Sequence, residues 1–231
     1  MQFSLGLDLS ESTELISDVI KEFRQAPCTR CRLSLIHPSN RGVMYRGNPE
    51  AHILVLDIAP GDTETAQGVP LCGGAGGEFE KWARYLALDT RNDIFVSQVV
   101  QCQPPRKKTK DGRFEQRDPD LDEISACWYP RTVRLIKAMP NLECIITLGW
   151  AAASALLGGE VIAKTHEGRW FVTDLIPKVA VFCLPHPEIM LVDPTPEKKG
   201  KITNHLDCFR REYLAGKKVI PIAQNTIIPV L

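Results

Sequence analysis

The chain has 231 residues, of which 44% are hydrophobic and 24% charged, a composition typical of a globular domain with an ordinary core. Its 28 basic and 28 acidic residues cancel, so net charge gives no argument for nucleic acid, and any DNA surface must come from locally clustered charge. No apolar run reaches the roughly 18 residues of a membrane span, and no signal-peptide pattern follows Met1. We expect a cytoplasmic location, where the eight cysteines act as metal ligands or buried thiols.

The apolar pattern predicts strands that alternate with helices. Short continuous apolar runs are typical of strands buried on both faces of a parallel sheet. One such run lies at residues 51–56, and we predict further strands at residues 94–100, 144–148 and 179–184. Apolar side chains at helical spacing predict helices over residues 9–25, 78–88, 120–138, 150–157 and 202–214. We therefore expect an α/β fold, a single domain over residues 1–215 with a central parallel sheet of about four strands flanked by helices.

Four cysteines are candidates for one metal centre. Cys28 and Cys31 form a Cys-x-x-Cys pair directly after a predicted helix, Cys102 follows a predicted strand, and Cys127 lies on a helix. Four thiolates suit either a tetrahedral zinc site or a [4Fe–4S] cluster. Cys102 and Cys127 are equally compatible with ordinary buried thiols.

Four further segments carry a family resemblance. They are Asp57-Ile58-Ala59-Pro60-Gly61, Gly68 through Gly76, Ser97 through Pro105, and His186-Pro187-Glu188-Ile189-Met190-Leu191. In this order, and together with the Cys-x-x-Cys pair, they resemble the motifs of the iron–sulfur, family 4-like uracil-DNA glycosylases. The resemblance covers about residues 28–213. It implies a uracil-DNA glycosylase-like fold and a [4Fe–4S] cluster held by the four cysteines, with zinc as the less favoured metal.

The resemblance also implies a function and a set of residue roles. The protein would excise uracil or a related deaminated or modified pyrimidine from DNA, by flipping the base and hydrolysing the N-glycosidic bond with water as nucleophile. His186 would hydrogen-bond to the base carbonyl as negative charge develops there. We expect a monomer that needs no partner other than DNA for this reaction.

Three residues of the expected base pocket depart from the family pattern. The resemblance places the base against Ile58, Ala59, Gly61, Leu71 and Gln98. The family has an acidic residue where this chain has Ile58, an aromatic residue at Leu71 and asparagine at Gln98. Asp57 and Asp62 are the nearest substitutes for the missing carboxylate, so Asp57 joins His186 as a candidate catalytic residue. Strand alternation leads us to expect Asp57 on the side opposite Ile58.

Two segments are candidate DNA contacts. Residues 106–117 form an insert relative to the family, with six basic and two acidic residues. It is either a solvated loop or a loop that follows phosphates through Arg106, Lys107, Lys108 and Lys110, with Phe114 as a stacking group. Ile189, Met190 and Leu191 are either core residues or a wedge for the gap left by the flipped base.

The C-terminal tail and the three departures from the family pattern in the base pocket leave other functions open. Residues 216–231 form an apolar tail, docked on the body or available to a replication or repair protein; its end faintly resembles a clamp-binding peptide but lacks the usual aromatic residues. The main alternative function is an inactive iron–sulfur protein that binds DNA or assists replication on the glycosylase scaffold. A zinc-stabilised nucleotide-binding enzyme is a weaker alternative, because no Gly-Lys-Ser/Thr phosphate loop is present.

Overall fold

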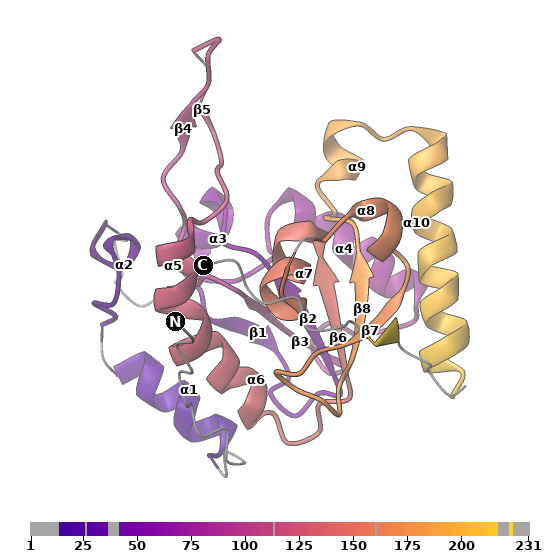
Figure 1. Cartoon of the computed structure of the whole chain (residues 1–231), viewed down its shortest axis with the longest axis horizontal. Helices are drawn as coiled ribbons and strands as arrows, with labels where there is room; N and C mark the ends of the chain where they lie inside the picture. The colour runs from indigo at the N-terminus through magenta and orange to yellow at the C-terminus, as the bar shows by residue number, and fades with distance from the viewer. Residues whose placement is uncertain are drawn as a thin grey trace, which may run out of the picture.

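A central β-sheet organises the computed structural model, which describes residues 14–25, 27–36, 42–112, 114–159, 161–216 and 222–223 (Figure 1). The strands follow the order β1-β3-β2-β6-β8-β7-β9 across the sheet. Their bounds are Tyr45–Gly47 (β1), Ile53–Asp57 (β2), Ile94–Gln98 (β3), Cys144–Leu148 (β6), Trp170–Val172 (β7), Ala180–Leu184 (β8) and Ile222–Ala223 (β9). Strands β4, Lys107–Lys108, and β5, Phe114–Glu115, form a separate hairpin.

The four inner strands confirm the predicted parallel sheet. β3, β2, β6 and β8 pair in parallel, and each of them coincides with one of the predicted apolar runs to within two residues at either end. The prediction omitted the edge strands, because β1 and β7 are only three residues long and contain half-buried positions that leave no continuous apolar run. β1 and β7 each pair antiparallel with their inner neighbour, and β9 pairs in parallel with β7.

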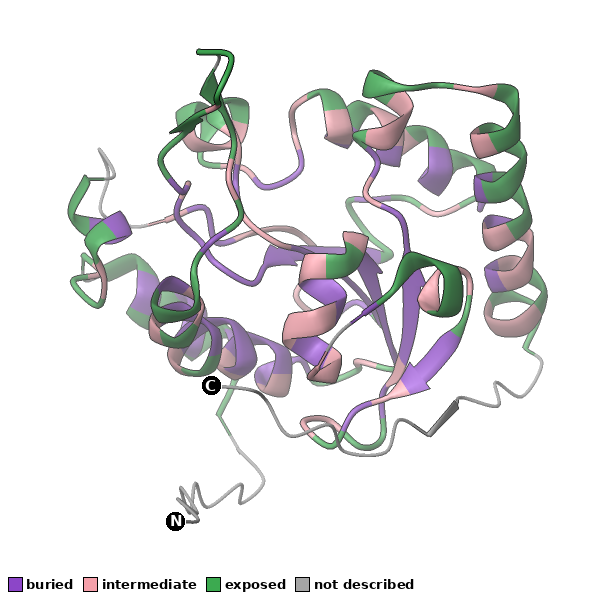
Figure 2. Cartoon of the chain, turned by 45° about the horizontal axis from the view of Figure 1, so that its top comes forward, coloured by how far each residue is buried: buried purple, intermediate pink, exposed green. Residues whose placement is uncertain are grey.

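Helices cover both faces of the sheet, as the colouring by burial shows (Figure 2). Side chains of a strand alternate between the two faces, so Leu54 and Leu56 join one core while Ile53 and Val55 join the other. The first core contains α1 (Ile16–Gln25), the helical run that ends in α6 (Arg134–Ala138), and α7 (Gly149–Leu157). The second contains α4 (Gly74–Tyr85) and α10 (Pro196–Phe209). The short helices are α2 (Arg32–Ile36), α3 (Asp62–Gln67), α8 (Ala163–His166) and α9 (Ile189–Val192).

The predicted helix over residues 120–138 is interrupted by a wider turn. It consists of α5 (Leu121–Cys127), a π-helical segment η1 (Trp128–Val133) and α6. Pro130 lies within η1 and has no N–H to donate, which disfavours the regular α-helical hydrogen-bond pattern. The π-helical turn begins immediately after Cys127, and such turns often mark functional sites.

Several boundaries differ from the prediction. α4 begins at Gly74, so the glycine run expected to form a turn supplies the first helical turn. α10 begins at Pro196, earlier than expected, and a second π-helical segment, η2 (Arg210–Leu214), ends that helical run. The helix predicted from residue 9 is described only from Ile16, and residues 217–221 and 224–231 of the tail lie outside the described part of the chain. No helix within the described ranges is long and apolar enough to cross a membrane.

Candidate active site and cysteine cavity

A cleft of about 470 Å³ opens at the carboxyl ends of the parallel strands. The chain passes from β2 to β3 on one side and then crosses back to β6 on the other, so the strand order reverses between β2 and β6. Open α/β sheets bind ligands at such a reversal. Asp57 ends β2, Gly149 follows β6 and His186 follows β8, and all three line the cleft.

Asp57 and His186 form a close pair in this cleft. Asp57 Oδ1 lies 3.3 Å from His186 Nε2 and accepts a hydrogen bond of 2.7 Å from the backbone N–H of Ile58. The other carboxylate oxygen accepts a hydrogen bond of 3.4 Å from Gln98 Nε2. The backbone N–H of Glu188 donates to His186 Nδ1 at 3.3 Å. In the neutral imidazole the proton therefore lies on Nε2 and faces Asp57.

The surroundings raise the pKa of His186 above its ordinary value. Burial alone would lower this pKa, because it penalises the imidazolium. The hydrogen bond to Asp57 and the negative charges of Asp57, Glu188 and Asp118 outweigh the effect of burial. The cleft therefore stabilises the imidazolium form of His186 relative to an ordinary histidine.

Most of the predicted base-pocket residues line the cleft, but Gln98 does not. Ile58, Ala59, Gly61 and Leu71 all lie in its wall. Gln98 is fully buried at the end of β3, on the far side of β2 from β6 and β8. Its amide contacts Asp57, which does line the cleft. Asp57 and Ile58 both line the cleft, which lies at the end of β2, and Ile58 also packs against the first core together with Leu54 and Leu56.

Leu71 adopts an uncommon backbone conformation. Its φ is +53°, a left-handed value that costs a non-glycine residue roughly 1–2 kcal/mol. Gly76 allows this turn, since a Cβ built on Gly76 would lie only 2.0 Å from the Leu71 carbonyl oxygen. Leu71 is buried in the wall of the cleft, at the position where the family has an aromatic residue.

Glu64 and Trp150 also line the cleft, and the sequence interpretation did not single them out. The Glu64 carboxylate accepts hydrogen bonds from the backbone N–H groups of Gly61, Cys72 and Gly73, which joins the loop after β2 to the start of α4. Trp150 follows β6 in the first turn of α7. A large aromatic residue at the carboxyl end of a predicted parallel strand was a signal that could have identified Trp150.

The basic insert forms the hairpin of β4 and β5, which projects from the body of the molecule (Figure 1). At its base, Arg106 lines the cleft and pairs with Asp62, so this carboxylate is engaged by a side chain of the protein. Lys107 pairs with Glu115 across the hairpin at 3.2 Å. Lys108 and Lys110 are exposed and make no ion pair with any residue that the structure describes.

The segment after His186 forms the short helix α9, and its predicted wedge residues differ in exposure. Ile189 and Met190 are half-buried and pack against the second core, as the alternative core interpretation predicted. Leu191 is exposed and lines the cleft. Val192, which was not predicted, is the most exposed residue of this helix.

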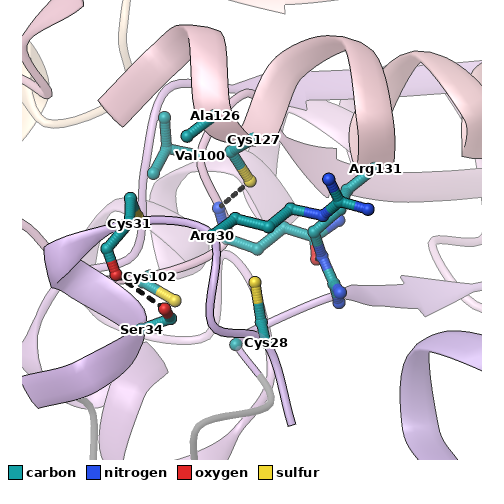
Figure 3. A pocket seen from close by; sticks show the side chains of 11 residues that line it. Cys28, Arg30, Cys31, Ser34, Val100, Cys102, Ala126, Cys127 and Arg131 are labelled. Atoms are coloured by element: carbon teal, nitrogen blue, oxygen red, sulfur yellow. Dashed lines mark hydrogen bonds between the residues drawn. The ribbon is translucent and has the colours of Figure 1, made fainter. Parts of the chain in front are cut away.

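The four predicted metal-ligating cysteines line one cavity (Figure 3). Cys28 and Cys31 precede α2, Cys102 follows β3, and Cys127 ends α5. The backbone N–H of Gln101 donates to Cys127 Sγ at 3.4 Å. Within the described residues, no three histidine, cysteine, aspartate or glutamate side chains are arranged to hold a single metal ion. The assignment of the four cysteines as ligands therefore stays a prediction.

The chemistry of this cavity suits a cationic group. Burial, together with the neighbouring Cys127, Cys28 and Cys31, raises the pKa of Cys102 to about 12. Burial likewise raises the pKa of Cys127 to about 11. Thiols that oppose each other's ionisation become good ligands once a bound cation inverts the local electrostatics.

A buried carboxylate connects the segments around the cavity. Glu123, on α5, accepts hydrogen bonds from Arg117 at 2.6 and 2.7 Å and from Arg32 at 2.9 Å. It also accepts a hydrogen bond of 2.9 Å from the Asp120 backbone N–H. Burial alone would raise the Glu123 pKa, but these hydrogen bonds outweigh burial and hold the pKa at about 2. Arg32 directly follows Cys31, and Arg117 ends the basic insert.

The chain belongs to the uracil DNA glycosylase superfamily, whose family model matches residues 44–207. A protein of Saccharolobus solfataricus named type-4 uracil-DNA glycosylase is 29% identical over 194 residues, which cover 81% of each chain. A protein of Archaeoglobus fulgidus with the same name is 28% identical and covers 78% of this chain and 85% of its own. A third, from Thermotoga maritima, is 27% identical over 67% of this chain and 71% of its own.

Proposed function

We propose that this protein is a monofunctional DNA glycosylase, which removes uracil or a related deaminated or modified pyrimidine from DNA. The observation that carries the proposal is the pair of His186 Nε2 and Asp57 Oδ1, 3.3 Å apart in a cleft at the carboxyl ends of the strands. Membership of the uracil DNA glycosylase superfamily supports the reaction class. A cleft of about 470 Å³ is large enough for a flipped nucleotide.

Cleavage of the glycosidic bond leaves an electron-poor sugar and an anionic base. His186 Nε2 faces Asp57 in the free protein, and a base carbonyl that enters the cleft would replace Asp57 as the acceptor of its hydrogen bond. This bond strengthens as the base becomes negative. The Asp57 carboxylate, released from this bond, is then available to an attacking water. Asp57 thereby takes over the electrostatic part of the role that the family gives to an acidic residue at the position of Ile58.

The same residues support one alternative, an inactive DNA-binding or replication-accessory protein on this scaffold. Ile58 has no group that could position water, and Leu71 offers no aromatic face to a flipped base. Gln98 does not line the cleft and so does not read a base edge there. In this alternative the protein retains the DNA-binding surface and the cysteine cavity but does not cleave the N-glycosidic bond.

An excision assay separates the two functions. We expect the purified protein to convert single-uracil oligonucleotides into alkali-labile abasic products, with duplex and single-stranded substrates tested side by side. Oligonucleotides that carry hypoxanthine, xanthine or 5-hydroxymethyluracil show which other bases the protein excises. If no substrate is cleaved, but Ile58→Glu with Leu71→Phe and Gln98→Asn cleaves uracil, the inactive alternative is correct.

We further propose that Cys28, Cys31, Cys102 and Cys127 hold a [4Fe–4S] cluster, with DNA as the partner molecule. All four cysteines line one cavity, and four thiolates are the ligand set that such a cluster requires. A bound cluster would cross-link three chain segments, and the cysteines would need no part in base excision.

The hairpin is the second DNA surface that we propose. If its exposed lysines contact phosphates, Lys108→Gln with Lys110→Gln should reduce the slope of log affinity against log salt by about 1.8 on duplex DNA, at about 0.9 per lost contact. Lys178, exposed just before the amino end of β8, provides the matched control, and Lys178→Gln should leave the slope unchanged. An unaltered slope in the hairpin variant would make the insert a solvated structure only.

A further inference from the structure

Trp150 differs from the other tryptophans of this protein in its exposure. Trp82, Trp128 and Trp170 are each 6% exposed or less, whereas Trp150 is 60% exposed. Its indole ring makes no hydrogen bond or ring contact with any residue in the described part of the chain. Large aromatic side chains are usually buried, and exposed ones beside a cleft mark binding surfaces.

The backbone places Trp150 beside the proposed catalytic pair. It follows Gly149, whose φ is +81° and whose missing Cβ lets the chain pass close to His186. A Cβ on Gly149 would lie 3.1 Å from His186 Cβ. Trp150 therefore directly follows Gly149, the residue that packs against His186, and it lines the same cleft.

The exposure of Trp150 places it at the mouth of the cleft and not at its floor. Asp57 and Leu71, which are buried, belong to the deep part, where a flipped base would enter. An indole at the mouth can meet the next base of the strand. That base offers its face only when it is unpaired and unstacked, because a duplex hides base faces against each other.

We propose that Trp150 stacks on an unpaired base that flanks the flipped nucleotide, and that this contact makes single-stranded DNA the preferred substrate. The inference rests on the proposed glycosylase function for the identity of the flipped nucleotide. Aromatic stacking tolerates any base sequence, which suits an enzyme that must accept every context of a damaged base. Trp150 also supplies the cleft with an aromatic surface, which Leu71 cannot provide.

The exposed indole allows a direct binding test. We expect a uracil-free single-stranded oligonucleotide to quench the tryptophan fluorescence of the protein, since the other three indoles are buried. Trp150→Ala should abolish the quench and weaken single-strand binding about 5- to 150-fold, measured by anisotropy of a labelled oligonucleotide. Trp150→Phe should lose the quench but keep most of the affinity. Tyr129→Ala, which removes an exposed aromatic that does not line the cleft, should change neither.

The outcomes separate this inference from the proposed function. DNA binding without a quench, or equal single-strand affinity of Trp150→Ala and the parent protein, would overturn the stacking role alone. Equal losses on single-stranded and duplex DNA would overturn the single-strand preference. A quench without uracil excision would leave the stacking contact and reject the glycosylase activity. Absence of any DNA binding would reject both.

Discussion

Replacing His186 by alanine is expected to lower the rate of uracil excision about 10²- to 10³-fold, the usual loss when one donor to a developing anion is removed. Affinity for the abasic product should change little, because the contact strengthens in the transition state. His52→Ala is a matched control, because His52 also pairs with a carboxylate, Glu143 at 3.1 Å, but just before the amino end of β2. A His186→Ala variant with the parent rate would remove this residue from the mechanism.

The pH profile of excision tests the role of Asp57 in the same pair. The charge of Asp57 helps to raise the pKa of His186, so the imidazolium persists to higher pH than in an ordinary histidine. The imidazolium is the stronger donor, and the rate should therefore fall as pH rises through this raised pKa. Asp57→Asn should move the fall to lower pH as well as reduce the rate. An unshifted profile would show that Asp57 does not act through His186.

Substitution of the predicted ligands Cys102 and Cys127 should have the largest effect on the stability of the protein and on its iron and sulfide content. The protein purified without oxygen is expected to be brown and to contain about four irons per chain, as a [4Fe–4S] cluster requires. Cys102→Ala or Cys127→Ala should remove iron, sulfide and colour, and should lower the unfolding temperature because metal binding is coupled to folding. Cys183→Ala is the matched control, since Cys183 is buried in β8 and does not line the cysteine cavity.

Two results would contradict the cluster. Stoichiometric zinc without iron in native protein would replace it by a zinc site. Full iron content in Cys102→Ala and Cys127→Ala would remove these residues from the ligand set. In both cases, comparing the excision rate of the same preparation with that of the parent protein shows whether changes in the cysteine cavity alter activity in the cleft.

The inner sheet could be predicted because its strands are buried on both faces, so that apolar residues make up most of each strand. The basic hairpin could not, because Lys107–Lys108 and Phe114–Glu115 are exposed two-residue strands without an apolar pattern. The pairing of Asp57 with His186 depends on the strand order, which brings the ends of β2 and β8 to one cleft. Gln98, placed in the pocket by motif, is instead fully buried at the end of β3, where its amide contacts Asp57.

We expect Glu123 to make the surroundings of the cysteine cavity unfold as one cooperative unit. One buried carboxylate is the common anchor of the segment after Cys31, the end of the hairpin at Arg117 and the first turn of α5. Its lowered pKa means that this anchor contributes its full stability above the ordinary glutamate pKa and loses it progressively as pH falls from there through about 2. Mild acid therefore leaves the anchor ionised, and native-state hydrogen exchange should show these three segments opening together.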